Sequence, residues 1–418
     1  MSTTATKRKT AGVIQPPEPD LTPEKMLARA KALRPTLLAN QGRCEAEGRV
    51  PEDVNEALVN AGFYRIVQPR RFGGYEFDVP TFYRVMMEIS RGCPETGWVL
   101  ALTAGHPMLL ASYAEAAQAE AYGPDGEFRG PASFSPPGQA TKAPGGYLVS
   151  GGWVSASGID VGTHFIGMAL AAPEKEGDPP EPIQVILERG QFEIVDDWKV
   201  MGMQGTGSKQ VRARNAFVPS HRTVPTMGSA RGSQAVPAAR LYDNPMYQGR
   251  IQPFLIGEAT AVAVGAARGA LDLYEQALLG KRSMFPPFLE RTEDPEFQAH
   301  YGRALALIAT AEAALVRAGE DFMAYAAEAA AGGEPFGEER ELGLTLIEQQ
   351  CVRLAWEAME LIYRTAGTSA SAKQGAAIGR IFRNMAVINT HPALQLDRTA
   401  VAAAKARLKA VSETSSAS

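Results

Sequence analysis

Residues 198 to 222 read WKVMGMQGTGSKQVRARNAFVPSHR, a glycine-rich segment followed by a strand-like run. The three glycines of GMQGTGS, residues 202 to 208, are typical of a tight turn. Their spacing is not that of a nicotinamide-binding loop, and the chain contains neither a dinucleotide fingerprint between a strand and a helix nor a P-loop. The run VRARNAFVP has the length and composition of a β-strand. This stretch therefore predicts a turn that leads into a strand.

Short runs of the same kind surround this stretch between residues 128 and 225. They include GGYLVSGGWVSASG, THFIGMALAA, PIQVILERG and FEIVDDW, separated by Gly and Pro. Apolar and β-branched residues at this length, between turn-forming residues, predict a small, mainly antiparallel β domain over 128–235. No helix of useful length is expected between residues 128 and 225.

Helical patterns flank the β domain on both sides. A helix start at Thr22-Pro23-Glu24 and a second one at Pro51-Glu52 predict an N-terminal helical domain over 21–127, after a polar, flexible tail of residues 1–20. Ala-rich and Leu-rich segments at about 251–281, 294–332, 338–366 and 375–411 predict four helices of a bundle within 236–418.

Composition excludes several classes of protein. A formal charge of -4 and a pI near 5.9, without a basic stripe, argue against nucleic acid as a partner. Three widely spaced cysteines indicate neither a disulfide framework nor a metal site, which fits the cytoplasm. No run approaches the roughly 20 apolar residues of a membrane span, so no membrane role is expected.

Four polar residues stand out as candidate site residues. His106 in TAGHPML and His391 in INTHPAL lie among apolar residues, where a charged imidazole is unfavourable without a partner. Residue type alone still favours a hydrogen-bonded core histidine in each case. Ser133 in ASFSPPG and Ser157 in SASG are typical turn or strand serines, and no GxSxG motif supports a hydrolase nucleophile.

Taken together, the chain resembles the acyl-CoA dehydrogenase superfamily. The matching pieces are GFYRIVQPRRFGG (62–74), GGYLVSGGWVSASG (145–158) and the stretch over 198–222. The resemblance implies an α+β fold in which an N-terminal helical domain, a middle antiparallel β domain and a C-terminal four-helix bundle hold a flavin. The dehydrogenases carry a catalytic Glu, but the segment RTAGTSASAKQGAAIGRIFRN has no carboxylate. Glu258 in LIGEATA is the remaining candidate for that base.

Within the superfamily the chain is similar to the oxygenase components of two-component flavin-dependent monooxygenases. These include 4-hydroxyphenylacetate and secosteroid-phenol hydroxylases and dibenzothiophene monooxygenase. The motifs that carry the resemblance are GHPMLLA with His106, SFSPPG with Ser133, WVSASG with Ser157 and RNMAVINTH, in the last helix, with His391. Asn384 stands where these proteins usually have Asp. The resemblance implies that the four polar groups meet in one otherwise apolar pocket.

The function that this resemblance implies is hydroxylation of a small phenolic substrate. Reduced FMN or FAD, supplied by a separate NAD(P)H:flavin reductase, reacts with O2 to give a C4a-hydroperoxyflavin, which transfers oxygen; no metal takes part. Ser157 is expected to hydrogen-bond flavin N5, whose proton must be kept to prevent release of hydrogen peroxide. Trp153 is expected near the ring edge, and Gly158 allows a close backbone approach. His391 is the candidate acid.

The remaining residues complete the implied site. His106 and Ser133 hold a substrate hydroxyl, and Ser133 also lies near the flavin. Arg282, with Ser369 as a second candidate, binds flavin phosphate, often across the subunit interface of a homotetramer. Three alternatives stay open: an N- or S-oxygenase of the same family, an acyl-CoA dehydrogenase or oxidase with Glu258 as a displaced base, and a flavoprotein scaffold without catalysis.

Overall fold

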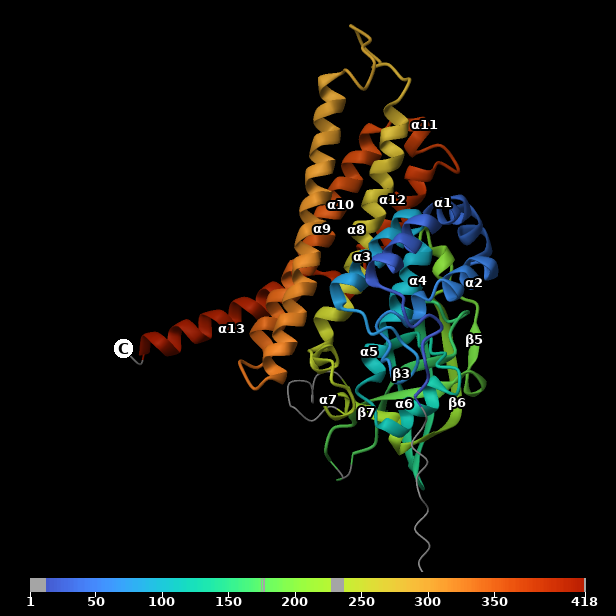
Figure 1. The fold of residues 1–418 in the computed structure, drawn as a ribbon, viewed down its shortest axis with the longest axis vertical. Helices are drawn as coiled ribbons and strands as arrows, with labels where there is room; N and C mark the ends of the chain where they lie inside the picture. Colours follow the sequence, from blue (N-terminus) through green and yellow to red (C-terminus); the bar gives the residue numbers. More distant parts are fainter. Residues whose placement is uncertain (1–12, 174, 176, 227–236, 417–418) are drawn as a thin grey trace, which may run out of the picture.

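The computed structural model describes residues 13–173, 175, 177–226 and 237–416, and its three regions follow the predicted order (Figure 1). The first region consists of α1 (Pro23–Glu47), α2 (Glu52–Asn60), α3 (Val79–Gly92), α4 (Pro94–Gly105), α5 (Pro107–Leu110) and α6 (Glu115–Tyr122). The predicted start of α1 is confirmed. The Thr22 hydroxyl accepts a hydrogen bond from the backbone N–H of Lys25, and Pro23 is the first helical residue.

Helix α4 positions much of the site. It is mostly apolar, and all its residues except the part-buried Leu102 are buried, as expected for a helix in the interior. It packs against α3 and against α8 (Ile251–Leu278) of the last region. The helix ends at Gly105, with His106 as its C-terminal cap. Side chains on α4 therefore lie between the first region and the bundle.

The middle region is one seven-stranded sheet. Its strands are β1 (Ala132–Ala143), β2 (Gly146–Ala156), β3 (His164–Ala171), β4 (Glu181–Glu188), β5 (Glu193–Val195), β6 (Lys209–Pro219) and β7 (Thr223–Pro225). Their order is β5-β6-β2-β1-β3-β4-β7, and only the β1–β3 pair is parallel. No α-helix occurs among the described residues between 128 and 225. The mainly antiparallel β domain is thus confirmed.

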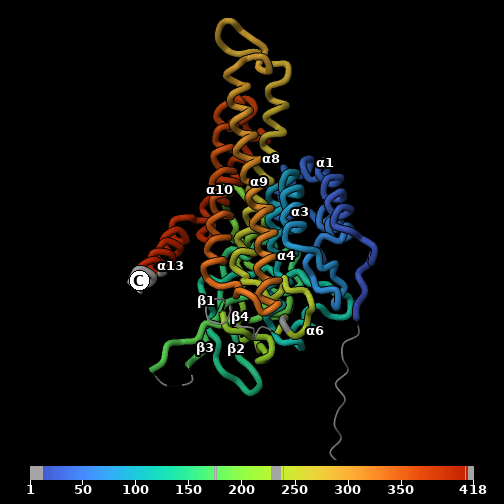
Figure 2. The backbone as a smooth tube through the Cα atoms, turned by 60° about the vertical axis from the view of Figure 1, so that its left-hand side comes forward, coloured from blue at the N-terminus to red at the C-terminus, as the bar shows by residue number. Residues whose placement is uncertain are grey.

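The third region contains the bundle. Its further helices are α7 (Ala238–Leu241), α9 (Pro295–Ala330), α10 (Glu338–Thr365), α11 (Thr368–Ser371), α12 (Ala377–Ile388) and α13 (Leu396–Ser416). Helices α8, α9 and α10 run side by side in both views and match three of the predicted segments (Figures 1 and 2).

The predicted extent of the fourth helix is wrong. Residues 375–411 form α12 and α13 rather than one helix, so His391 does not lie in a helix but directly before a short 3-10 turn at Pro392–Leu394. Pro392 has no backbone N–H and disfavours helical geometry at the preceding residue, which accounts for the break. Helix α13 then runs away from the bundle (Figure 1).

The expected extent of the flexible tail is corrected. Residues 13–20, predicted to belong to a flexible tail, lie against the first region: the Ile14 N–H donates to the Arg71 carbonyl at 3.1 Å, and Glu18 pairs with Arg29 at 2.6 Å. Residues 1–12 of the predicted tail are outside the described residues.

Helix α8 is long and apolar enough to cross a membrane, but 89% of its most apolar window is buried inside the protein.

Candidate active site

Ser157 and His391 are brought together by a residue that the sequence reading did not select, Trp98 of α4. The Trp98 indole Nε1–H donates to Ser157 Oγ at 3.0 Å. The Trp98 ring also meets the His391 imidazole edge-on, with ring centroids 5.7 Å apart and an interplanar angle of 63°. Ser157 is buried, whereas the His391 side chain is exposed. One indole therefore connects the end of β2 with the turn after α12.

The imidazole of His391 has a defined tautomer when it is neutral. Its Nδ1 accepts a hydrogen bond from the backbone N–H of Ala393 at 3.3 Å, so the neutral ring carries its proton on Nε2. Protein atoms packed around the ring desolvate it and lower its pKa, although part of the side chain stays exposed. His391 can consequently donate a hydrogen bond from Nε2 without carrying a charge.

A chain of hydroxyl groups continues from Ser157 into the interior. Ser157 Oγ lies 2.7 Å from Ser208 Oγ, which lies 2.6 Å from Thr206 Oγ1. Thr206 Oγ1 is in turn 2.7 Å from the carbonyl oxygen of Met203. Met203, Thr206 and Ser208 belong to GMQGTGS, which forms the predicted turn. Met203 and Gly207 lie in the left-handed region, at φ 56° and 52°. The turn thus supplies polar groups to Ser157 in addition to its structural role.

Asn384 secures this turn from the side of the bundle. Its Oδ1 accepts a hydrogen bond from the Met203 N–H at 2.7 Å, and the residue is buried. The neighbouring Arg380 and Arg383 both pair with Glu45 of α1 instead. A neutral amide is therefore sufficient at position 384, because the partner is a backbone N–H rather than a cation.

His106 lies where the three regions meet. Its Nδ1 is 2.5 Å from the carbonyl oxygen of Gly130, which leads into β1, and its Nε2 is 3.6 Å from Glu258 Oε1 on α8. Both side chains are buried. Within the described residues, neither carboxylate oxygen of Glu258 has a hydrogen-bond partner. Both ring nitrogens of His106 therefore face protein atoms, and the predicted contact with a substrate hydroxyl stays a prediction.

The Glu258→Gln variant should be more stable than the wild type at alkaline pH. Burial raises the pKa of Glu258 from 4.5 to about 6, while the nearby His106 opposes that rise. The folded state therefore holds this proton more tightly than the unfolded state, and the associated stability is lost as the pH rises from 4.5 through about 6. A shift of that size is worth about 2 kcal/mol. Gln removes this ionisation.

Thermal unfolding over a pH series measures this effect. The melting temperature of Glu258→Gln should exceed that of the wild type at alkaline pH, and the difference should shrink as the pH falls through the range from about 6 to 4.5. The control is Glu357→Gln, at an exposed position of α10. A difference that does not change with pH would contradict the assignment.

Ser133 lies beside the WVSASG stretch. Its Oγ donates to the carbonyl oxygen of Val154 at 2.6 Å, and the residue is buried. Because the single hydroxyl proton is used there, its remaining lone pairs can only accept further hydrogen bonds. Ser133 follows three residues after Gly130, so the hydrogen bond from His106 holds the segment that carries it.

Trp153 and Gly158, predicted to contact the flavin, have mainly internal partners. The Trp153 side chain is fully buried in the core of the sheet, where its Nε1–H donates to the Met168 carbonyl at 2.7 Å. The structure does not bring it to Ser157, which Trp98 contacts instead. Gly158 has φ 76°, and a Cβ there would be 2.9 Å from Val99 Cγ1. Gly158 therefore allows the chain to pass closely over α4.

Arg282 and Ser369 lie apart from this cluster, at the far end of the bundle. Arg282 pairs with Glu290 at 3.0 Å in the connection between α8 and α9. Arg291 donates both to the Arg282 carbonyl and to the Ala366 carbonyl, which places these connections together (Figure 1). Within one chain neither predicted phosphate ligand reaches Ser157 or His391.

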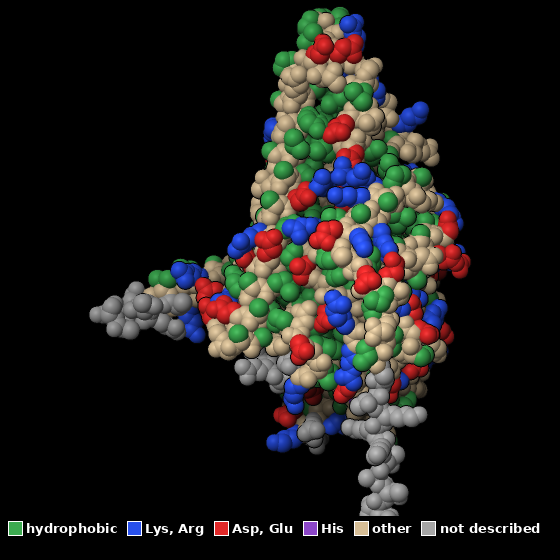
Figure 3. All heavy atoms as spheres, in the orientation of Figure 1, with side chains coloured by type: hydrophobic (Ala, Val, Ile, Leu, Met, Phe, Trp, Pro, Cys, Tyr) green, Lys and Arg blue, Asp and Glu red, His purple; other side chains and the backbone are tan. Residues whose placement is uncertain are grey.

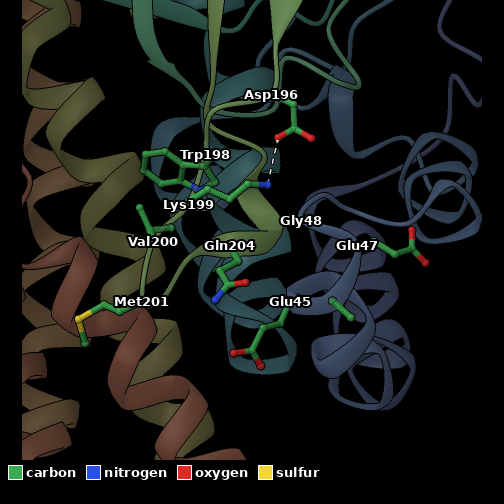
Figure 4. Close-up of a pocket in the computed structure, with 10 residues that line it drawn as sticks. Glu45, Glu47, Gly48, Asp196, Trp198, Lys199, Val200, Met201 and Gln204 are labelled. Atoms are coloured by element: carbon green, nitrogen blue, oxygen red, sulfur yellow. Dashed lines mark ion pairs between the residues drawn. The ribbon is translucent and has the colours of Figure 1, made fainter.

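A cavity of about 400 Å³ lies beside the segment that leads into the turn (Figure 4). The end of α1 forms one wall and residues 196–204 form the other, with an ion pair between Lys199 and Asp196 at 3.7 Å. Its lining is largely polar, and none of the predicted site residues belongs to it. The single apolar pocket that was predicted therefore does not correspond to this cavity.

Three residues of the cluster escaped the sequence reading: Trp98, Thr206 and Ser208. Trp98 sits in the apolar run ETGWVLAL, where a buried indole N–H needs an acceptor, and that need was the available signal. Thr206 and Ser208 are the only hydroxyl residues of GMQGTGS, which was interpreted as a turn alone. Neither signal identifies Ser157 as the partner, since Ser157 is 59 residues away from Trp98 and 51 residues away from Ser208 in the sequence.

Comparison with known proteins shows which family the chain is similar to. A family model described as acyl-CoA dehydrogenase, C-terminal domain, matches residues 258–396, and one described as acyl-CoA dehydrogenase, N-terminal domain, matches residues 28–125. Over 275 residues, 65% of this chain and 70% of the relative, the sequence is 34% identical to the flavin-dependent monooxygenase oxygenase subunit HsaA of Rhodococcus jostii (strain RHA1).

Two further comparisons extend the similarity. The chain is 32% identical over 263 residues, 62% of each protein, to the FADH2-dependent resorcinol hydroxylase, oxygenase component, of Rhizobium sp. (strain MTP-10005). The crystal structure of 3-HSA hydroxylase from Rhodococcus sp. RHA1 matches with a TM-score of 0.83 at 27% identity. That match covers 92% of this chain and 97% of the other.

Proposed function

The chain belongs to the oxygenase components of flavin-dependent monooxygenases, which share the acyl-CoA dehydrogenase fold, and from that membership we propose that it hydroxylates a small phenolic substrate with O2 and reduced FMN or FAD. The observation that carries the proposal is the cluster of Ser157, Trp98 and His391. It joins the end of β2, helix α4 and the turn after α12, so all three regions contribute to one site.

The residues of this cluster fit a reduced flavin. Reduced flavin has a proton on N5. Ser157 Oγ has two lone pairs and uses one to accept the hydrogen bond from Trp98, so the other is left to accept a hydrogen bond from N5. When bound, the flavin supplies the electrons that activate O2. In the proposed site Ser157 accepts the N5 proton's hydrogen bond and His391 Nε2 donates toward the reacting oxygen. The buried Trp98 keeps water from the side of α4.

The substrate end of the site is assigned to Ser133 and His106. Ser133 Oγ has acceptor capacity left for a phenolic hydroxyl, which supports the proposal. His106 needs to turn away from Glu258 before Nε2 can bind that hydroxyl. Glu258, buried and paired with His106, is poorly placed to serve as the exposed base of a dehydrogenase. Oxidation at nitrogen or sulfur remains a second outcome of the test below.

A second subunit and a separate reductase complete the proposal. The far end of the bundle exposes Arg282 together with Met284, 81% exposed, and Phe285, 74% exposed. Apolar side chains exposed to this extent favour coverage by another copy in a homotetramer. Figure 3 shows acidic and basic side chains interspersed over the face that it draws. In the tetramer, Arg282 and Ser369 would bind the flavin phosphate of a neighbouring subunit.

The function is tested with the full chain, isotopically labelled O2, reduced FMN or FAD, and a panel of phenols, amines and sulfides. The expected result is labelled hydroxyphenol, with less hydrogen peroxide than in the absence of phenol. NAD(P)H is expected to support turnover only after a flavin reductase is added. Oxidation of an amine or sulfide alone would move the reaction to nitrogen or sulfur. Release of all electrons as peroxide with every substrate would contradict the proposal.

A further inference from the structure

The hydroxyl chain behind Ser157 has a direction, which its two ends determine. A carbonyl oxygen only accepts, so the Thr206 hydroxyl donates its proton to Met203. Ser208 then donates to Thr206, and Ser157 donates to Ser208. At the other end the Trp98 indole only donates, and Ser157 Oγ accepts from it. Every hydroxyl proton in the chain therefore points away from the site.

This direction leaves Ser157 with a lone pair and no free proton. Its two assigned partners are Trp98 and Ser208, and in the described part of the chain no other donor is bonded to Oγ. We propose that Thr206 and Ser208 are positioning residues that make Ser157 a hydrogen-bond acceptor, so that the site selects reduced over oxidised flavin. The inference rests on the proposed function, in which Ser157 lies at flavin N5.

The selection follows from the chemistry of N5. In reduced flavin N5 carries a proton and donates a hydrogen bond, whereas in oxidised flavin N5 has no proton and accepts one. An acceptor at this position therefore stabilises the reduced form and leaves oxidised N5 facing a lone pair, without a donor. Release of the spent cofactor is favoured by the same geometry.

The inner end of the chain is held firmly. Met203 is fixed in the left-handed region, its N–H donates to Asn384 Oδ1, and its carbonyl also accepts from Trp198 Nε1 at 2.9 Å. Thr206 and Ser208 are 2% and 3% exposed, so water does not compete for their protons. Asn384, on α12, is thereby linked to the hydrogen bonding of Ser157 on the β domain.

The test is Thr206→Val, which keeps the side chain's shape and removes its hydroxyl. Ser208 then has no acceptor at position 206 and can donate back to Ser157, whose own proton turns toward the flavin. The ratio of the dissociation constants of oxidised and reduced FMN, or FAD, should fall by roughly tenfold, a change of about 1.4 kcal/mol. Equilibrium binding measures oxidised flavin in air and reduced flavin under anaerobic conditions. Damage to packing alone weakens both forms together and leaves the ratio unchanged.

The matched control is Thr206→Ser, which retains the hydroxyl and should retain the wild-type ratio. If Thr206→Val fails to fold, Ser208→Ala, which removes the acceptor of Ser157 directly, carries the same expected fall. An unchanged ratio in a folded variant that binds flavin overturns the inference. Failure of the wild type to bind either form of flavin instead overturns the proposed function, so the two failures are distinguishable.

Discussion

Replacing His391 by Ala is expected to lower the yield of hydroxylated product per flavin oxidised by about a hundredfold, with hydrogen peroxide formed in its place. The reason is the loss of the Nε2–H donor of a ring that packs against Trp98, since the Ala393 N–H binds Nδ1 and Nε2 is the other ring nitrogen. Product and peroxide are measured in the same reaction, from the same amount of reduced flavin.

The matched control for this variant is His221→Ala, in the 3-10 turn at Ser220–Arg222, where the imidazole pairs with Glu120, and it should leave the yield unchanged. Burial lowers the pKa of His391, so the neutral ring predominates at neutral pH and above. Because the neutral ring keeps the Nε2 proton, the wild-type yield should not fall as the pH rises from neutral into the alkaline range. An unchanged yield in His391→Ala would remove His391 from the reaction.

The fold was predictable where local pattern and tertiary structure agree. The Thr22 cap, the strands between turn-forming residues and the three long bundle helices follow from periodicity and capping, which are local properties. The prediction of one helix over 375–411 was wrong because the Ala-rich pattern continues past Pro392. Helical periodicity was given more weight than this one helix-breaking residue. The prediction of a flexible tail missed the contacts of Ile14 and Glu18, because a polar, Pro-bearing composition does not reveal packing partners.

The candidate site was predictable only as a set of residue types. Ser157 and His391 were selected and both lie beside Trp98, but Trp98 belongs to a helix whose packing the sequence does not specify. Trp153 was expected near the flavin because it belongs to the WVSASG motif that also contains Ser157. Alternation along an unbroken strand would place Trp153 and Ser157, four residues apart, on the same face, but the strand is irregular between Trp153 and Ala156, where Ser155 has φ 59°, and a turn begins at Ser157.

The pairing of His106 with Glu258 illustrates the same limit. Each residue was noted separately, one as a substrate ligand and the other as a displaced base. Their contact requires α4 to pack against α8, which depends on the assembled core rather than on either segment. In this conformation Glu258 pairs with His106. Glu258 therefore cannot serve as a displaced base while His106 binds a substrate hydroxyl.

Replacing Ser157 by Ala is the second change with a large expected effect. It removes the acceptor of Trp98 Nε1–H and the donor to Ser208, and it leaves flavin N5 without the partner that the proposal gives it. The expected result is at least about a tenfold rise in peroxide relative to product, the factor that corresponds to 1.4 kcal/mol. Ser150→Ala, at a part-exposed position of β2, the strand that ends just before Ser157, is the matched control and should leave this ratio unchanged. The variant should also lose the preference for reduced flavin, which separates it from His391→Ala, where the preference should persist because Ser157 is intact. If Ser157→Ala keeps both the product yield and the preference, then the hydroxyl chain that ends at Ser157 serves only to hold the turn over 202–208 in place.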